Sequence, residues 1–224
     1  MHMALSDWEI ILGGGLVLSD KYKVSGSKSL SQGFNGGATH IVHKSTYNDA
    51  PLNVQIDTWM TVGQNDDCYY YHIGGIARKQ PDVRTYLYWD LVIRIRSDTT
   101  VDLVDLSYGY YENGTQNELN CISFEPEFKN ALGDTWSWGS WRYVRMYCYE
   151  SGGKITIYIG MTPDIANPDP SNPPTDQIKD ICSVTFNTPD CVKNGGACGL
   201  IVGGVECGYA TIGQPFYDYT QIYY

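Results

Sequence analysis

Apolar and polar residues alternate one by one along much of this chain, which is the period of a half-buried β-strand. The clearest alternation lies in NVQIDTWMTV (53–62), TYLYWDLVIRIR (85–96), WRYVRMYCY (141–149) and KITIYI (154–159). A helical period does not run over two turns or more, apart from one short candidate at 126–132. The pattern therefore predicts a chain built from short strands.

Turn-forming sequences separate these strands. They are GQNDD (63–67), ENGT (112–115), ESGGK (150–154) and Gly203-Gly204. The last two have hairpin composition, so 141–149 should pair with 154–160, and the strands on either side of Gly203-Gly204 with each other. Locally paired short strands predict an all-β protein of two stacked antiparallel sheets, forming a single domain over residues 1–224.

The longest irregular segment is TPDIANPDPSNPPTDQIKD (162–180), which contains five prolines and four aspartates. A loop of this length inside a compact domain is usually functional or mobile. We predict that it protrudes, either over a binding edge or as an arm that reaches a neighbouring subunit.

Three segments resemble the concanavalin A-like jelly rolls, especially their laminin G-like and glycan-binding branches. They are SDKYKVSGSKSLSQGF (19–34), WRYVRMYCYESGGKITIYIG (141–160) and GACGLIVGGVECGYATIGQPFYDYTQIYY (196–224). The resemblance implies a two-sheet antiparallel jelly-roll sandwich. In the 141–160 hairpin it implies that Val144, Met146 and Cys148 face the core, and that Tyr143, Arg145, Tyr147 and Tyr149 face outward. This fold hosts lectins, glycosidases, lyases, adhesins and assembly subunits, so it does not by itself fix the function.

The charge of the chain excludes one class of partner. The formal net charge is −10 and the sequence pI is about 4.7, with no cluster of Lys and Arg, whereas binding to a nucleic-acid backbone needs a basic surface.

No apolar run approaches the roughly 20 residues of a membrane-spanning helix, so membrane insertion is not expected. Asp7 and Glu9 lie where a signal peptide would be apolar, and we expect no such peptide here. We expect a protein that is extracellular or associated with a cell or virion surface.

Four of the seven cysteines crowd the end of the chain with the spacing C-x8-C-x6-C-x8-C. We predict one or two disulfides among Cys182, Cys191, Cys198 and Cys207, which would indicate an oxidising compartment. The alternative is that all seven thiols are reduced.

The 19 tyrosines are the most informative feature of the composition. Sugar rings stack their C–H faces on aromatic rings, and neighbouring Asp and Arg side chains hydrogen-bond the hydroxyls. The predicted glycan-binding residues are Tyr69, Tyr71, Tyr86, Tyr88, Asp90, Arg94, Tyr108 and Tyr110. The alternative is that these tyrosines pack against one another across strands or form a subunit interface.

Acidic residues suggest a structural calcium ion as the cofactor. Asp66 and Asp67 lie in a Gly/Asn loop and Asp218 lies in the closing strand, where the resemblance implies that an aspartate helps to hold calcium. The alternative is that these are ordinary turn and surface aspartates. His40 and His43 are three residues apart, on opposite faces of a strand, and are therefore a poor metal pair.

Three functions remain open. The first is a non-catalytic, lectin-like carbohydrate-binding protein. The second is a self-assembling subunit of an extracellular filament, tube or virion, whose partner is its own copies. The third is a polysaccharide-cleaving enzyme, for which Glu125 and Glu127 are the nearest carboxylate pair, although Pro126 lies between them.

Overall fold

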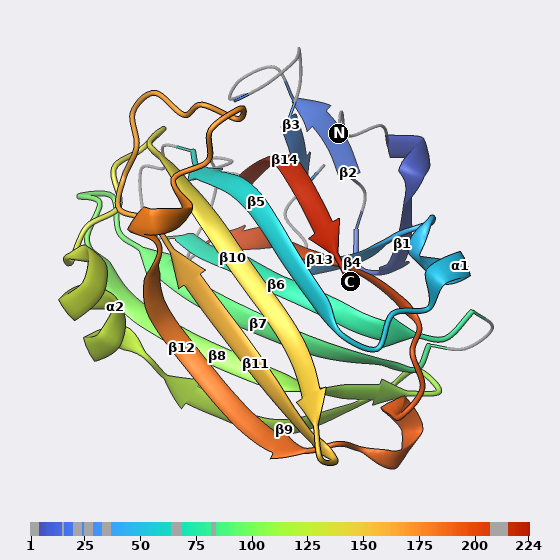
Figure 1. Ribbon diagram of the computed structural model, residues 1–224. Coiled ribbons are helices and arrows are strands. Elements are labelled where there is room, and N and C mark those ends of the chain that lie inside the picture. Colours follow the sequence, from blue (N-terminus) through green and yellow to red (C-terminus); the bar gives the residue numbers. More distant parts are fainter. Residues whose placement is uncertain are drawn as a thin grey trace.

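Two seven-stranded antiparallel sheets stack face to face (Figure 1). The computed structural model describes residues 5–14, 16–19, 24, 29–32, 37–63, 69–81, 84–206 and 215–224. We call the sheets A and B. In spatial order, sheet A contains β1 (Trp8–Leu12), β4 (Gly37–His43), β13 (Ala197–Glu206), β6 (Tyr69–Lys79), β7 (Tyr86–Ile95), β8 (Val101–Glu112) and β9 (Thr115–Ser123). Sheet B contains β12 (Lys179–Asn187), β11 (Lys154–Met161), β10 (Trp141–Ser151), β5 (Val54–Val62), β14 (Pro215–Tyr223), β3 (Ser29–Gln32) and β2 (Leu16–Ser19).

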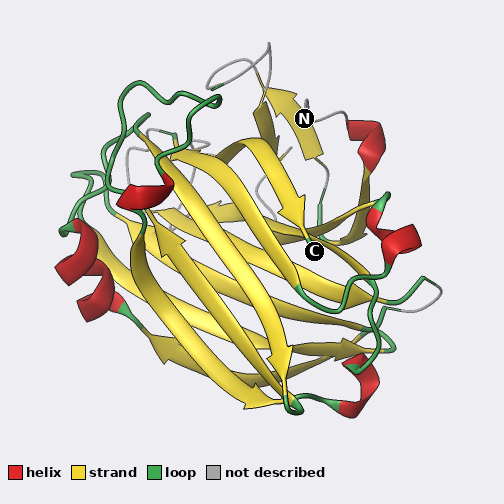
Figure 2. Cartoon of the chain, viewed as in Figure 1, coloured by secondary structure: helices red, strands yellow, loops and turns green. Residues whose placement is uncertain are grey.

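The helices are short and lie at the rim of the sandwich (Figure 2). They are α1 (Thr46–Asp49), α2 (Glu125–Leu132) and the 3-10 turns η1 (Leu5–Asp7), η2 (Thr175–Gln177) and η3 (Asp190–Val192). The helix expected at 126–132 is thus present as α2, with Pro126 in its first turn, where the missing N–H costs nothing. Neither α-helix in the described part of the chain is long and apolar enough to cross a bilayer.

Strands that are distant in sequence lie side by side, as in a jelly roll. β5 lies between β10 and β14, and β13 lies between β4 and β6. The predicted all-β, two-sheet antiparallel sandwich is therefore confirmed. The predicted hairpin of β10 and β11 is also confirmed, with Met146 opposite Ile159 and Cys148 opposite Ile157.

The core lies between the sheets and takes alternate residues from each strand. On sheet B the inward residues of the hairpin are Val144, Met146 and Cys148, all fully buried, as the resemblance implied. On sheet A the inward residues of β7 include Leu87, Trp89 and Leu91. A single aliphatic and aromatic layer thus holds the two sheets together.

The hairpin predicted at Gly203-Gly204 is wrong. Both glycines lie inside β13, which continues to Glu206 while pairing with β6 on one side and β4 on the other. Gly203 is opposite His72 on β6 and Ala38 on β4, so a glycine pair that looks like a turn is the middle of a central strand. The segment expected to pair back was 205–210: its first two residues continue β13 instead, and 207–210 lie outside the described residues.

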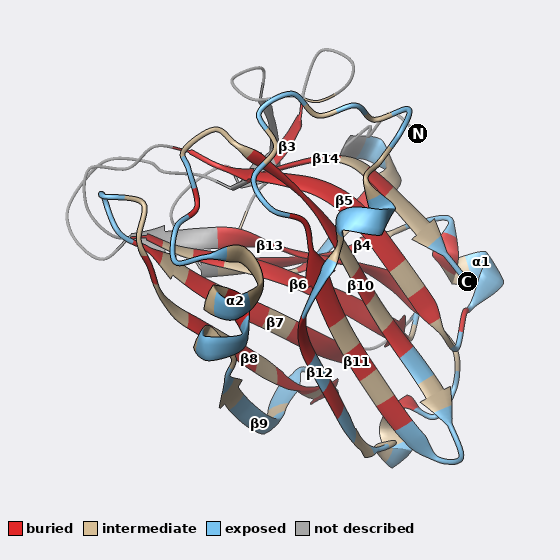
Figure 3. Cartoon of the chain, turned by 60° about the vertical axis from the view of Figure 1, so that its left-hand side comes forward, coloured by how far each residue is buried: buried red, intermediate tan, exposed pale blue. Residues whose placement is uncertain are grey.

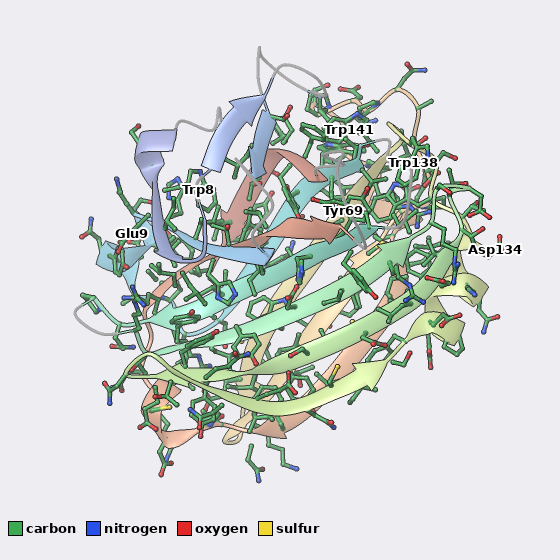
Figure 4. The ribbon with its side chains drawn as sticks, turned by 180° about the vertical axis from the view of Figure 1, so that it is seen from behind. Trp8, Glu9, Tyr69, Asp134, Trp138 and Trp141 are labelled. Atoms are coloured by element: carbon green, nitrogen blue, oxygen red, sulfur yellow. The ribbon has the colours of Figure 1, made fainter. Side chains whose placement is uncertain are left out.

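The proline-rich loop is anchored to the sandwich at both ends before it extends beyond the strand ends in Figure 1. The backbones of Ile165 and Trp141 exchange two hydrogen bonds of 2.8 and 2.9 Å. Ile165 and Ile178 pack against an aromatic cluster on the outer face of sheet B, which includes Trp59 and Tyr143. Figure 4 shows Trp138 and Trp141 together at this end of the molecule, opposite Trp8. The loop therefore covers one end of sheet B.

A buried arginine fixes the start of this loop. Arg142 donates from Nε to Asp164 Oδ1 at 2.7 Å and from Nη2 to the Thr135 carbonyl at 3.0 Å. Its guanidinium lies over the rings of Trp136 and Phe128, at 4.5 and 5.2 Å from their centroids. Burial lowers the pKa of Arg142, and the charge and hydrogen bond of Asp164 oppose that shift. The ion pair thus offsets part of the cost of burying the guanidinium charge.

We expect Asp164→Ala to destabilise the protein by about 3 kcal/mol, because it leaves the buried Arg142 charge without its carboxylate. Urea unfolding measures the change. The matched control is Asp169→Ala, which removes an exposed carboxylate of the same loop that bonds Ser171, and which should leave stability almost unchanged. Equal losses in the two variants would contradict the role given to the buried pair.

Candidate functional site

The predicted glycan-binding tyrosines do not share one surface. Tyr69 and Tyr71 point between the sheets and are fully buried in the core, with ring centroids 4.7 Å apart. Ile73 continues the same inward face, so the two-residue period places both rings inside. The prediction that they bind glycan is therefore wrong.

Tyr108 and Tyr110 also lie on the inner face of sheet A. Tyr108 is buried and stacks on Phe186 of sheet B, with centroids 5.0 Å apart. Tyr110 is partly buried against the same core. The inward direction follows from Leu106, which shares their face of β8. These two tyrosines hold the sheets together and are not part of a glycan surface.

Tyr86 and Tyr88 do lie on the outer face of sheet A, but they are buried there by their neighbours. Tyr86 stacks on Tyr111 at 4.7 Å and hydrogen-bonds Nδ1 of His40 at 3.0 Å. The Tyr88 hydroxyl accepts from Gln116 Nε2 at 2.9 Å. Both rings therefore follow the alternative to glycan binding, in which the tyrosines pack against one another across strands. His40 is buried and belongs to this cluster.

The two charged members of the predicted set are held by other side chains of sheet A. Asp90 Oδ2 is 2.7 Å from Nδ1 of His72, and Arg94 Nε donates to Asp102 Oδ1 at 2.6 Å. Burial works against a charged His72, but the charge and the hydrogen bond of Asp90 outweigh it and raise the pKa of His72. For His40, burial dominates and lowers the pKa to about 4.

The calcium prediction is not settled by these residues. Asp66 and Asp67 lie outside the described residues. Asp218 is buried, and its carboxylate accepts from the backbone N–H groups of Val24 and Tyr219 at 2.7 Å each. Within the described ranges, no three His, Cys, Asp or Glu side chains gather as metal ligands would. The calcium site remains a prediction.

The predicted disulfides are absent among the described cysteines. Cys182, Cys191 and Cys198 are free thiols, and Cys207 lies outside the described residues. Cys182 is on β12 of sheet B, Cys198 is on β13 of sheet A and Cys191 is in η3, so chain spacing did not reflect proximity. The thiols therefore lend no support to an oxidising compartment.

Glu125 and Glu127 do not form a catalytic pair. They are two residues apart in the first turn of α2, and side chains at this spacing on a helix do not face each other. Glu125 instead pairs with Lys129 at 2.7 Å, one helical turn away.

The outer face of β10 changes from buried to exposed along its length (Figure 3). Tyr143 is buried beneath the proline-rich loop, Arg145 and Tyr147 are half-buried, and Tyr149 near the hairpin tip is 52% exposed. Tyr147 stacks on Tyr158 of β11, with centroids 4.5 Å apart and planes at 10°. The hairpin therefore presents aromatic rings to solvent where the loop no longer covers it.

A buried carboxylate organises this face. Asp57 of β5 accepts from Arg145 Nε at 3.0 Å and from Arg145 Nη2 at 2.8 Å, and from the Tyr143 hydroxyl at 3.0 Å. Gln55 Nε2 adds a further contact to Asp57 at 3.2 Å. A bidentate pair of this kind fixes the guanidinium as well as neutralising the carboxylate.

Two adjoining grooves lie along the exposed part of sheet B. The first, which we call the tyrosine groove, is about 610 Å³, and the tyrosines and polar side chains that line it are Asn53, Gln55, Tyr147, Tyr149, Thr156, Tyr223 and Tyr224. The second, which we call the polar groove, is about 690 Å³, and Gln55, Glu127, Arg145, Tyr147, Tyr158, Asp180 and Ser183 are among the residues that line it. Tyr223 and Tyr224 are 47% and 63% exposed.

The sequence predicted the outward direction of two of the four tyrosines that line the tyrosine groove. The alternation in 141–149 put Tyr147 and Tyr149 on one face, and the resemblance to the jelly-roll hairpin implied that this face points outward, which the structure confirms. Tyr223 and Tyr224 gave no local signal, because they reach the groove through the pairing of β14 with β5, where Tyr223 is opposite Gln55. That pairing joins segments far apart in the chain.

No protein-family model matches the chain, and no curated protein sequence matches it significantly. Solved structures that resemble it include the legume lectin-like domain from Entamoeba histolytica, at 9% identity and a TM-score of 0.49, covering 98% of this chain and 90% of that one. The CBM2 module of the evolved Dit of Lactobacillus casei BL23 phage J-1 is similar at 11% identity and a TM-score of 0.46, covering 96% of this chain and 77% of that one. The conserved carbohydrate esterase of Shiga toxin-encoding bacteriophage phi24B is similar at 10% identity and a TM-score of 0.45, covering 96% of this chain and 88% of that one. At these identities and scores the similarities bear on neither the site nor the function of this chain.

We expect acid to weaken the fold through His40. Its folded-state pKa of about 4 lies below the ordinary value of 6.5, so the unfolded chain binds the proton first, and stability falls as pH drops through this window. The loss between pH 7 and pH 5 should be about 2 kcal/mol. His72 acts in the opposite sense, because its pKa is raised.

Urea unfolding at pH 7 and pH 5, compared between the wild-type protein and His40→Gln, isolates this contribution. The free energy of unfolding of the variant should fall less between pH 7 and pH 5 than that of the wild-type protein, because the contribution of His40 is missing. This holds whatever the stability of the variant at pH 7. The same pH dependence in both proteins would show that His40 does not titrate as described.

Proposed function

We propose that this protein binds carbohydrate, with the tyrosine groove as its binding site. The observation that carries the proposal is the exposure of Tyr149, Tyr223 and Tyr224, which leave between 47% and 63% of their surface in solvent around one groove. Elsewhere in the described sheets most tyrosines are buried or half-buried. Exposed aromatic rings beside a groove are typical of a surface that binds a ligand.

The polar groups of the groove suit sugar hydroxyls. Asn53 Oδ1 accepts from the backbone N–H of Glu150 at 2.8 Å, which fixes the amide, and the contact with Asp57 orients Gln55. The Thr156 hydroxyl pairs with that of Thr185 at 2.9 Å. Amides and hydroxyls held in place by the protein can exchange hydrogen bonds with a sugar, while the tyrosine rings take its C–H faces.

Polysaccharide cleavage is the second candidate, and the His72–Asp90 pair is the observation that favours it. A carboxylate on Nδ1 orients an imidazole for general acid–base catalysis through its other nitrogen. Ser107, opposite Asp90, donates to Glu118 at 2.7 Å and adds polar groups to the same face. Release of reducing sugar that is lost in His72→Gln would support this candidate, whereas release that survives the substitution would exclude His72 as its acid or base.

Removal of an exposed ring should weaken binding. We expect Tyr149→Ala and Tyr223→Ala each to reduce affinity for a glycan that binds the wild-type protein by at least tenfold, about 1.4 kcal/mol. A glycan array identifies the ligand and isothermal titration measures the loss. The matched control is Tyr70→Ala, a half-buried tyrosine on the outer face of sheet A that contacts Arg94 and should bind normally.

Binding unchanged in both groove variants would exclude the tyrosine groove. Exposed tyrosines also suit contacts between copies of the chain, the self-assembly alternative for a filament, tube or virion subunit. Sedimentation velocity separates the two: assembly that disappears in Tyr149→Ala, with no response to any glycan, would support the subunit and contradict the proposal.

A further inference from the structure

We infer that the ligand is an uncharged glycan chain, several sugars long, that lies across sheet B through both grooves. This rests on the proposed function of the tyrosine groove and adds the polar groove as a second subsite.

The two grooves are continuous. Gln55 and Tyr147 line both of them, so a ligand in one reaches the boundary of the other at these side chains. The residues at the two ends are Tyr223 on β14 and Asp180 on β12. The ends are on the first and last of five neighbouring strands, in the order β14, β5, β10, β11 and β12. At the usual strand spacing, the distance from the first of these strands to the last is about 19 Å, which is longer than one sugar ring.

The position of Tyr158, which lines the polar groove, depends on a glycine two residues away. A Cβ at Gly160 would be 2.2 Å from the Tyr158 hydroxyl, so the absence of a side chain lets Tyr158 lie over this part of β11. The same hydroxyl donates to Asp180 at 2.6 Å, and the ring stacks on Tyr147. Tyr158 therefore extends the aromatic surface of the tyrosine groove into the polar groove.

The charges around the grooves select against an anionic chain. None of the described side chains that line the tyrosine groove carries a charge. The polar groove has one cation, Arg145, and two carboxylates, Glu127 and Asp180. Arg145 is engaged by Asp57 through two hydrogen bonds, so its charge is largely balanced before a ligand arrives. With a formal charge of −10 on the whole chain, a uronate polymer would be repelled, most strongly at low salt.

The test is isothermal titration of the wild-type protein with matched oligosaccharides. The probes are two-unit and six-unit oligomers of neutral β-glucan, xylan and mannan, and oligogalacturonates of the same two lengths. We expect at least one neutral six-unit oligomer to bind ten or more times more tightly than its two-unit counterpart. The oligogalacturonates should bind at least tenfold more weakly than that neutral six-unit oligomer, and more weakly still as salt is lowered.

Two variants locate the chain-length effect. Tyr158→Ala should abolish the tenfold gain in affinity from two-unit to six-unit oligomers, because it removes the ring that extends the aromatic surface into the polar groove. Gly160→Ala, which displaces Tyr158 without removing it, should do the same. If either variant fails to fold, as judged by circular dichroism and thermal unfolding, the length and charge series on the wild-type protein still decides the inference.

The outcomes separate this inference from the proposed function. Equal affinity for two-unit and six-unit oligomers, or tighter binding of oligogalacturonate, overturns the inference and leaves the tyrosine groove as a carbohydrate site. A length gain that persists in Tyr158→Ala overturns the assignment of the polar groove. Binding of none of these probes, together with none on a glycan array, overturns the proposed function itself.

Discussion

The two-residue period of a strand is the constraint on which the rest of this structure depends. Each strand that covers the core must send alternate side chains inward, and the neighbouring residues are then forced outward. On β10 this places Val144 and Met146 in the core, and Arg145 and Tyr147 on the outer face. The side chains available for a ligand on sheet B are thus determined by the residues that the core requires.

Tyrosine explains where sequence reasoning succeeded and where it failed. In β10, the alternation separated two faces of different composition, and the resemblance to the jelly-roll hairpin implied correctly which of them is inward. In β6, Tyr69 and Tyr71 alternate with Tyr70 and His72, so both faces have similar hydrophobicity. Because tyrosine is stable in either environment, the local pattern does not identify the buried face. The structure buries Tyr69 and Tyr71 because Ile73 continues their face into the core.

Other features depend on contacts between distant segments, which local patterns do not contain. The position of Tyr223 beside Gln55 requires β14 to pair with β5, and Gly203 is in mid-strand because β4 and β6 flank it. The sandwich itself could be predicted, since alternation and turns recur along the whole chain. The placement of Cys182 and Cys198 on opposite sheets could not, because cysteine spacing is uninformative once the chain crosses between layers.

Burial of the thiols has a consequence for the chemistry of the folded protein. Burial raises the pKa of Cys148, Cys182 and Cys198 to about 12, so at neutral pH only about one in 10⁵ of each is the thiolate that attacks disulfides or peroxides. These sulfur atoms act as small apolar core groups. These three buried thiols should therefore react slowly with disulfides or peroxides that reach the folded protein from the surrounding solution.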